Sequence, residues 1–254
     1  MNFRRSSMMV LPSSGGTGAR RSSCVLLSSA GLPQEPVTVY VVRLSPPCRA
    51  VWIYLAQNKI PYNLIDVDYS QNNPDLAEKN PHESVPTMID GDIVVFEGQA
   101  ILRYLSSRYT NYASYGSTLA QRMQVESVIA WASSELHRIV GYRCAYPQSL
   151  EKYSLASRAA TEVLVKSGIE QLITTLETLE KHYLKDKSFL CGNRLTMADI
   201  VVATTLIQAE WVGFSFRMWP KVSKWLHAVA KVEFWEDVHK THDEYVKELK
   251  EALD

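Results

Sequence analysis

Hydrophobic and polar positions in the first half of the chain predict a small sheet with helices between its strands. The β-branched, apolar run Val37–Val42 is typical of a buried strand. Apolar residues at helical spacing follow Pro46 and Pro47, which suit the first turn of a helix. Tyr62–Val67 predicts a second strand, so this stretch is expected to form a βαβ unit.

The pattern continues with a hairpin and another helix. We expect a short helix over Asp75–Lys79, a third strand over Val85–Ile89 and a fourth over Ile93–Phe96. The Asp-Gly pair between the last two strands is a strong two-residue hairpin signal. A helix begins near Glu97, which completes the order β-α-β-α-β-β-α by about Tyr109.

Beyond this unit the spacing of apolar residues is helical throughout, and Ala159–Leu184 predicts the longest helix. Asn111–Thr118 lacks periodic apolar positions and is rich in turn-forming residues, which predicts a linker. We therefore expect an α/β domain over residues 36–110, a linker over 111–118 and an all-α domain over 119–254.

Residues 1–35 differ from the rest of the chain. Four arginines lie among many serines and glycines, and Glu35 is the first acidic residue. This composition is typical of an organellar transit peptide, but it also suits a disordered tail or an upstream stretch that follows from the choice of start codon. Under any of these interpretations the segment lies outside the fold.

Composition and charge exclude several classes of protein. The 27 basic residues balance 27 acidic ones, so the chain lacks the positive field from which nucleic-acid binding draws much of its affinity. Apolar runs are far shorter than the ~20 residues of a membrane span. The four cysteines include no CxxC pair, which indicates neither a zinc site nor a redox dithiol and fits a reducing compartment. His239 and His242 are closely spaced, and on a late, polar helix we expect solvated side chains rather than metal ligands.

Ser45 stands at the junction between the first strand and the first helix, in the run LSPPCRA. A helix start favours a nearby anion because of its unpaired N–H groups and its positive dipole end. A hydroxyl there can donate to a thiolate and lower its pKa without reacting itself. A serine before proline is also an ordinary helix cap, so this position alone leaves both interpretations open.

Two further positions have the chemistry of a peptide-binding site. If the Val85-Pro86 bond is cis, the main chain of Val85 could hold a peptide like an unpaired sheet edge; a trans proline on an edge strand is the alternative. Glu97 and Gly98 begin the helix after the hairpin, where a carboxylate can accept a ligand's α-ammonium and the helix start can hold its carboxylate. A plain acid that complements the helix dipole is the other interpretation of Glu97.

Together, SPPCRA, VPxxIDGD and the acid that precedes AIxxYL resemble the cytosolic glutathione transferases, and most of all the theta class. The resemblance covers roughly Val37 to about His242. A second mark is Leu195–Ile200, which is similar to the folding box of that family, with Thr196 as helix cap and Asp199 bonding back to it. The resemblance implies a thioredoxin-like α/β N-terminal domain and an all-α C-terminal domain.

The resemblance also implies a role for each site residue. Ser45 would activate glutathione, and Val85, ahead of the family's cis-proline at Pro86, would bond the cysteinyl backbone of the tripeptide. Glu97 would meet the γ-glutamyl end. Gln71, in the loop after the second strand, matches a position at which relatives place a contact to the glycyl end.

Two positions depart from the family pattern. Gly98 stands where relatives have a serine, so one hydrogen bond to the γ-glutamyl carboxylate, worth about 1 kcal/mol, is lost while the backbone amide remains. Ser84 stands where theta relatives often carry a lysine, which removes a charge near glutathione. We therefore predict weaker glutathione binding than in an ordinary theta enzyme.

Cys48 offers a rival mechanism, because some related classes form a mixed disulfide with glutathione through a cysteine at the first helix. We expect Cys48 instead to be buried and to pack in the core. The electrophile would lie against the helix around Trp131 to Tyr142, which also carries Arg138, and against the C-terminal segment near Trp235. Arg138 is a candidate for polarising a leaving group, or else a solvent-exposed arginine.

The implied function is transfer of glutathione, as co-substrate, to small electrophiles such as alkyl halides, epoxides and activated alkenes, with reduction of organic peroxides as a second activity. No metal is expected. A catalytically silent glutathione-transferase-like assembly module is the alternative. The resemblance implies a homodimer with a role in detoxification in the cytoplasm, or in a mitochondrion or plastid if the N-terminal segment directs it there.

Overall fold

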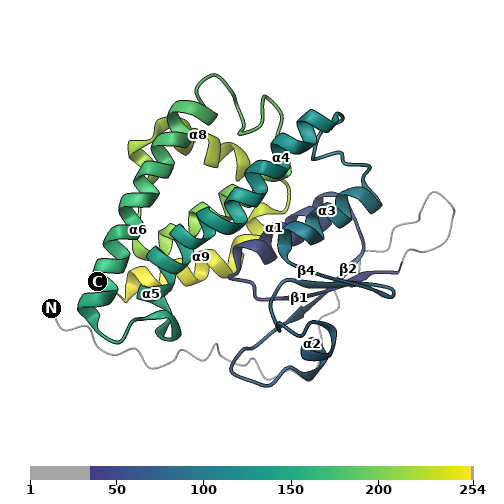
Figure 1. Ribbon diagram of the computed structural model, residues 1–254, viewed down its shortest axis with the longest axis horizontal. Helices are drawn as coiled ribbons and strands as arrows, with labels where there is room; N and C mark the ends of the chain where they lie inside the picture. The colour runs from purple at the N-terminus through teal and green to yellow at the C-terminus, as the bar shows by residue number, and fades with distance from the viewer. Residues whose placement is uncertain (1–34, 253–254) are drawn as a thin grey trace.

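A four-stranded sheet forms the centre of the first half of the chain in the computed structural model, which describes residues 35–252. The strand order is β2-β1-β3-β4, and β1 runs parallel to β2 and antiparallel to β3 (Figure 1). The strands are β1 (Val37–Val41), β2 (Tyr62–Asp66), β3 (Thr87–Asp90) and β4 (Ile93–Phe96).

Three helices cover this sheet. Helices α1 (Pro46–Gln57) and α3 (Gly98–Tyr109) lie on the side that faces the rest of the molecule, and α2 (Pro74–Lys79) lies on the other side (Figure 1). Apolar side chains of α1 and α3 are fully buried in the same core as the inner residues of the sheet. Because α1 connects two parallel strands, its N-terminus lies at the carboxyl end of β1.

The second half is helical. One long helix begins as α4 and continues through two π-helical segments into α5, and α6 with its π-helical end lies beside it (Figure 1). The bounds are α4 (Leu119–Trp131), η1 (Ala132–Leu136), η2 (Arg138–Ala145), α5 (Tyr146–Ser149), η3 (Glu151–Tyr153), α6 (Arg158–Thr178), η4 (Leu179–Tyr183), α7 (Met197–Leu206), η5 (Ile207–Val212), η6 (Phe216–Met218), α8 (Pro220–Val229) and α9 (Trp235–Glu251).

The predicted fold class is confirmed, since an α/β part with the expected element order is followed by an all-α part. The first two strands end one residue before the prediction, and the largest difference is at the start of the third strand. The third strand begins at Thr87 rather than Val85, because Pro86 has no N–H to give to the ladder and Tyr40 opposite Thr87 is the last pair with β1.

The predicted capping box at the start of α7 is present and supports the fold. The carboxylate of Asp199 accepts the backbone N–H of Thr196 at 2.8 Å and that of Leu190 at 2.8 Å. It also accepts the indole N–H of Trp225 at 2.9 Å. Asp199 is fully buried, so these bonds replace the water that its carboxylate loses on folding.

The prediction that His239 and His242 are solvated is wrong. Both side chains are fully buried, and the ring of His239 stacks on Trp235 with 3.9 Å between centroids. The reason is that α9 turns this face inward toward the buried Arg49 of α1. Burial, followed by the positive charge of Arg49, lowers the pKa of His239 to about 2. Both histidines are therefore neutral parts of the core.

Some predictions fall outside what the structure tests. The tail predicted over residues 1–35 lies, except for its last residue, outside the described residues, and the predicted domain boundaries at 110 and 118 stay predictions. Within residues 35–252, no helix combines the length and apolar character that a bilayer crossing needs. That part of the chain also holds no group of three or more His, Cys, Asp or Glu side chains arranged to ligate a metal.

Candidate functional site

Ser45 occupies the N-cap position of α1, with φ −75° and ψ 123°, but its side chain makes no capping hydrogen bond. The next two residues, Pro46 and Pro47, have no N–H for it to accept. The hydroxyl instead lies within hydrogen-bonding reach of the thiol of Cys48, which is a weak partner. Ser45 is half-buried, and its hydroxyl is not used for helix capping.

Cys48 is buried at 2% exposure, as predicted. Burial raises the pKa of its thiol to about 11, although the hydroxyl of Ser45 and the backbone of Val42 act in the opposite direction. The thiol is therefore protonated near neutral pH and shielded from solvent, which is the environment of an inert structural cysteine.

Val85 lies just before β3, at the same end of the sheet as the start of α1. The Val85-Pro86 peptide bond is cis. Among the described residues, the backbone–backbone hydrogen bonds do not include the N–H or the C=O of Val85. The preceding residue, Ser84, accepts the side-chain amide of Asn80 at 3.2 Å through both its carbonyl and its hydroxyl oxygen. An unpaired main-chain edge thus lies beside a loop that is held in place.

Glu97 and Gly98 join β4 to α3 and face the start of α1. Glu97 is exposed and has φ 69° and ψ 118°, a backbone conformation that costs a non-glycine residue about 1–3 kcal/mol and is found mainly at functional sites. A Cβ atom on Gly98 would lie 2.9 Å from Cβ of Pro47. Gly98 therefore coincides with close packing between the starts of α3 and α1.

Gln71 lies in the exposed loop between β2 and α2. Its side-chain amide donates to the carboxylate of Asp68 at 3.1 Å, and Asp68 also accepts the backbone N–H of Ser70 at 2.8 Å. These bonds hold the Asp68 carboxylate ionised, and its pKa is lowered, first by the side chain of Ser70. The structure thus fixes Gln71 within its own loop.

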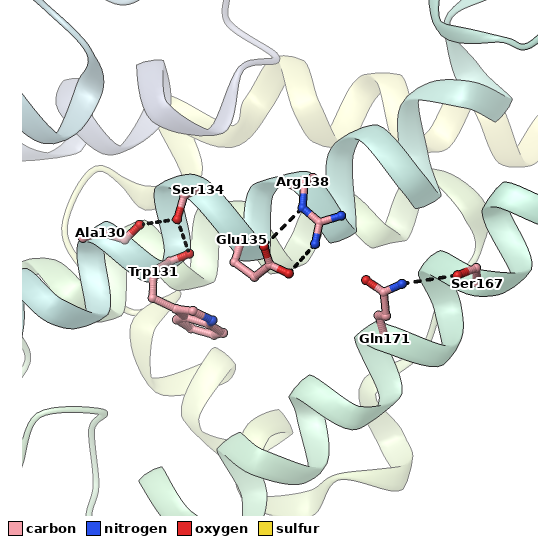
Figure 2. Close-up of polar contacts among 7 residues, drawn as sticks. All are labelled: Ala130, Trp131, Ser134, Glu135, Arg138, Ser167 and Gln171. Atoms are coloured by element: carbon pink, nitrogen blue, oxygen red, sulfur yellow. Dashed lines mark hydrogen bonds and ion pairs between the residues drawn. The ribbon is translucent and has the colours of Figure 1, made fainter.

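The three residues predicted to bind the electrophile each have a different partner. Trp131 stacks on Tyr183 with 6.5 Å between ring centroids, and Trp235 stacks on His239. Arg138 forms an ion pair with Glu135, and its Nε donates to Oε2 at 3.1 Å. Figure 2 shows Trp131 and this ion pair along one side of the helix, with Gln171 and Ser167 of α6 across from them. Trp131 and Arg138 thus lie on the same side of one helix, and the role of all three residues stays a prediction.

The structure also contains an aromatic cluster, of which the sequence analysis names only Tyr142, as the end of the helix predicted to line the electrophile site. We call Tyr142, Tyr146 and Tyr153 the tyrosine cluster; their ring centroids are 5.2 to 5.5 Å apart. Leu44, the neighbour of Ser45, packs against the apolar group that contains Tyr146. Tyr142 is half-exposed, and burial followed by neighbouring negative groups that include Glu97 raises the pKa of its phenol.

Local packing fixes the tyrosine cluster. The hydroxyl of Tyr146 lies 3.0 Å from Nε2 of His137, and burial lowers the pKa of His137 to about 4, so the imidazole is neutral. A Cβ on Gly141 would lie 2.7 Å from Cε2 of Tyr146, so only glycine lets this ring lie on the helix. A signal was available in the sequence: aromatic residues four apart, directly after a glycine.

The site therefore combines five features within one region. They are a hydroxyl at a helix start that makes no capping bond, an unpaired main-chain edge, an exposed carboxylate, a second helix start and an aromatic wall. A hydroxyl and a helix dipole stabilise an anion, and a main-chain edge holds a peptide backbone. This arrangement suits an anionic nucleophile on a peptide that meets an apolar partner.

Comparison with known proteins identifies the same architecture elsewhere. The family models "Glutathione S-transferase, N-terminal domain" and "Glutathione S-transferase, C-terminal domain" match residues 39–117 and 150–231. Human glutathione S-transferase theta-1 is 34% identical over 202 residues, which cover 75% of this chain and 81% of that protein. Dichloromethane dehalogenase from Methylophilus leisingeri is 31% identical over 222 residues, covering 80% and 82%. The solved structure of human glutathione-S-transferase T1-1 in its apo form superposes with a TM-score of 0.72 at 28% identity, covering 85% of this chain and 96% of that one.

Proposed function

The chain belongs to the glutathione S-transferase family and resembles its theta class, and from that premise we propose that the hydroxyl of Ser45 stabilises the thiolate of bound glutathione for attack on small electrophiles. The enzyme uses glutathione as co-substrate. The observation that carries the proposal is that this hydroxyl stands at the start of α1 and yet caps no helix. It is therefore available to a sulfur atom.

The proposed chemistry is modest. The glutathione thiol loses its proton to solvent, and Ser45 donates a hydrogen bond to the sulfur anion while keeping its own proton. A hydrogen bond to a charged group is worth roughly 1.5–3 kcal/mol, and each pKa unit corresponds to about 1.4 kcal/mol. One such bond lowers the pKa of the thiol by about one to two units from ~8.5. The thiolate becomes a substantial fraction of bound glutathione near neutral pH.

Glutathione fits the main-chain features of the site in an extended form. Its cysteinyl backbone would pair with the N–H and C=O of Val85, beside Pro86 and Ser84. Its γ-glutamyl ammonium would meet Glu97, and its γ-glutamyl carboxylate the N–H of Gly98 at the start of α3. Its glycyl end would reach toward Gln71.

We propose alkyl halides, epoxides and activated alkenes as electrophiles. The sulfur lone pair forms the new carbon–sulfur bond. The electron pair of the breaking bond leaves with the halide or stays on the opened epoxide oxygen, and for an activated alkene the π electron pair moves onto the activating group. The oxygen or carbon that gains this charge then takes a proton from solvent. Reduction of organic peroxides is proposed as a second activity of the same thiolate. The name of the relative dichloromethane dehalogenase supports halides as substrates. We assign the surface that contacts the electrophile to Tyr142 and Tyr153. Trp131, Arg138 and Trp235 are the candidates for this contact that the sequence predicts.

The alternative, a catalytically silent assembly module, predicts no turnover at all. A rival catalytic residue, Cys48, is disfavoured because its thiol is buried and has a raised pKa. Turnover of purified protein with glutathione and a panel of halides, epoxides and organic peroxides separates these possibilities. We expect Ser45→Ala to reduce kcat/KM by about 10- to 100-fold, which is the fold-change that a lost hydrogen bond of roughly 1.5–3 kcal/mol corresponds to.

Cys48→Ala is the matched control, because it changes a residue one helical turn away and removes the rival nucleophile. We expect it to keep kcat/KM within a few-fold of wild type. Full activity in Ser45→Ala, or loss of activity only in Cys48→Ala, would contradict the proposed role of Ser45.

We also propose a homodimer with a role in detoxification. Large apolar side chains are exposed on β4 and α4, at 48% for Ile93, 37% for Phe96, 73% for Leu119 and 50% for Met123, and an exposed apolar surface of this kind favours association. Light scattering after size exclusion tests the assembly. The cytoplasm is the proposed location, with a mitochondrion or plastid as the alternative, and imaging of a C-terminal fusion distinguishes them.

A further inference from the structure

Lys152 contacts two tyrosine rings that come from different halves of the chain. It lies in η3, and its ammonium nitrogen is 5.0 Å from the ring centroid of Tyr153 and 5.2 Å from that of Tyr69, in the loop between β2 and α2. The face of an aromatic ring attracts a cation, so the two rings together hold this ammonium group in place. Lys152 therefore has a defined position, although its side chain is exposed.

This position joins the two sides of the proposed site. Tyr153 belongs to the tyrosine cluster, and its ring centroid is 5.5 Å from that of Tyr142. The hydroxyl of Tyr69 donates to the carbonyl oxygen of Glu83 at 3.1 Å, two residues before Val85. The ammonium group of Lys152 thus lies at the border between the main-chain edge and the surface assigned to the electrophile.

The charge of Lys152 is not balanced by an acidic side chain. Across residues 35–252, no ion pair or hydrogen bond involves its ammonium group. An ammonium group has three N–H donors, and a carboxylate oxygen accepts from them more strongly than a ring face does. A carboxylate of a ligand that reaches this point would gain a charge-assisted hydrogen bond without breaking an existing ion pair.

One acidic side chain acts on the tyrosine cluster as well. The pKa of Tyr142 is raised by burial first, and the negative charge of Glu97 adds to this. In the proposed complex Glu97 meets the γ-glutamyl ammonium of glutathione, which balances its charge. Lys152 then provides a positive charge beside the bound electrophile.

We propose that Lys152 makes the enzyme select electrophiles that carry a carboxylate: the apolar part of the substrate lies against Tyr142 and Tyr153, and its carboxylate accepts a hydrogen bond from the ammonium group. This inference rests on the proposed function. The bonds that form and break are unchanged, since the thiolate sulfur bonds to carbon and a halide leaves with its electron pair. Lys152 therefore determines specificity and takes no part in the chemical step.

Two benzyl halides of almost the same shape isolate the effect of the charge. The compounds para-(chloromethyl)benzoate and para-(chloromethyl)benzamide share the ring, the reacting carbon and the leaving group. We expect Lys152→Gln to lower kcat/KM for the benzoate by about 3- to 5-fold and to leave kcat/KM for the benzamide unchanged. Glutathione consumption, corrected for the uncatalysed reaction, measures both values. An equal fall for the two substrates overturns the proposal, and so does an unchanged kcat/KM for the benzoate.

Lys152→Arg and Lys224→Gln are the matched controls. The arginine keeps the positive charge, so the preference for the benzoate should persist. Lys224→Gln removes an exposed charge from α8 and should change neither kcat/KM. A loss in Lys224→Gln equal to that in Lys152→Gln would show a general effect of net charge and would overturn the proposal. A higher KM for glutathione in Lys152→Gln would make Lys152 a contact of glutathione instead and would also overturn it.

A second measurement needs no glutathione, so it separates failure of this inference from failure of the proposed function. The compounds para-methylbenzoate and para-methylbenzamide have no leaving group, and their binding can be followed through the amide NMR signals of Lys152 and Tyr153. We expect the Kd for the benzoate to be about 3- to 5-fold weaker in Lys152→Gln than in wild type, and the Kd for the benzamide to be unchanged. If this holds while neither halide is turned over, the proposed function fails and the carboxylate site remains. Equal binding of the benzoate by wild type and Lys152→Gln overturns the inference, whatever the turnover.

Discussion

The start of α1 and the tyrosine cluster meet at Leu44, but they are built in different ways. Around the start of α1, the groups available to a ligand are main-chain atoms of Val85 and Gly98 and the side chains of Ser45 and Glu97. In the tyrosine cluster they are large rings whose positions depend on one another, with centroids 5.2 to 5.5 Å apart. The first region is fixed by backbone geometry, and the second by side-chain packing.

This difference in construction has consequences for chemistry. Main-chain groups at helix starts and sheet edges bind charged and peptide ligands with fixed geometry. Aromatic rings provide a large apolar contact surface that requires no particular bond direction, so they can contact apolar partners of different shape. We therefore expect changes at the start of α1 to affect glutathione, and changes in the tyrosine cluster to affect the electrophile.

Glu97→Gln provides the largest expected effect on the glutathione side. The substitution keeps the shape of the side chain and removes the charge that would pair with the γ-glutamyl ammonium. A hydrogen bond to a charged group contributes roughly 1.5–3 kcal/mol, so we expect the Kd for glutathione to rise by about 10- to 100-fold. Calorimetry measures the Kd, and Asp92→Asn, another exposed acid of the same part, should leave it unchanged. Equal binding by Glu97→Gln would remove Glu97 from the site.

Acid should weaken the packing around the tyrosine cluster. The pKa of His137 is lowered by burial from 6.5 to about 4 in the folded protein. Between about pH 6.5 and 4 the unfolded chain therefore binds a proton at this imidazole and the folded chain does not. The contribution of the neutral imidazole to the free energy of unfolding is complete above about pH 6.5 and is lost as the pH falls toward 4. We expect the free energy of unfolding to fall by up to about 1.4 kcal/mol per pH unit for this group.

Urea unfolding of wild type and His137→Gln between pH 7.5 and 4.5 measures that slope. The free energy of unfolding of the variant should depend less on pH than that of wild type, whatever its stability at neutral pH. The reason is that the slope with pH equals the number of protons taken up on unfolding, and the variant lacks the proton that His137 takes up. Identical slopes would mean that His137 titrates with a normal pKa, and the packing described for the tyrosine cluster would be wrong.

Tyr142→Ala should act on the electrophile side. Removing a half-exposed ring loses apolar contact with the substrate, and we expect the KM for the electrophile to rise about 5- to 10-fold while the KM for glutathione stays within two-fold. Arg138→Gln gives the direct contrast, since Arg138 is paired with Glu135. If Arg138→Gln raises the electrophile KM and Tyr142→Ala does not, the wall lies on the side shown in Figure 2 and not at the tyrosine cluster.

The same contrast explains how much could be predicted from the sequence. The positions of the residues proposed to bind glutathione could be predicted because they lie next to the ends of strands and helices, which Pro46, Pro86 and Gly98 mark. Tyr142 was named from the sequence, but its contacts with Tyr146 and Tyr153 were missed. Two π-helical segments over residues 132–145 shift the helical period, so faces assigned by regular spacing no longer hold. The burial of His239 was missed for a related reason, since only the packing of α9 on α1 decides which face is inside.

The smallest expected effect concerns the one departure from the family at the start of α3. Gly98→Ala places a Cβ 2.9 Å from Cβ of Pro47, so one of the two helix starts must move. Small overpacking of this kind costs about 1 kcal/mol or more, which lowers Tm by roughly 2–4 °C in a protein of this size. Ser107→Ala, on the exposed face of the same helix, should leave Tm unchanged in a calorimetric scan. An unaltered Tm in Gly98→Ala would show that the backbone at Pro47 moves without loss of stability. The close contact between α1 and α3 would then not explain why position 98 is a glycine. In that case a serine at position 98 would be expected to strengthen glutathione binding without lowering Tm.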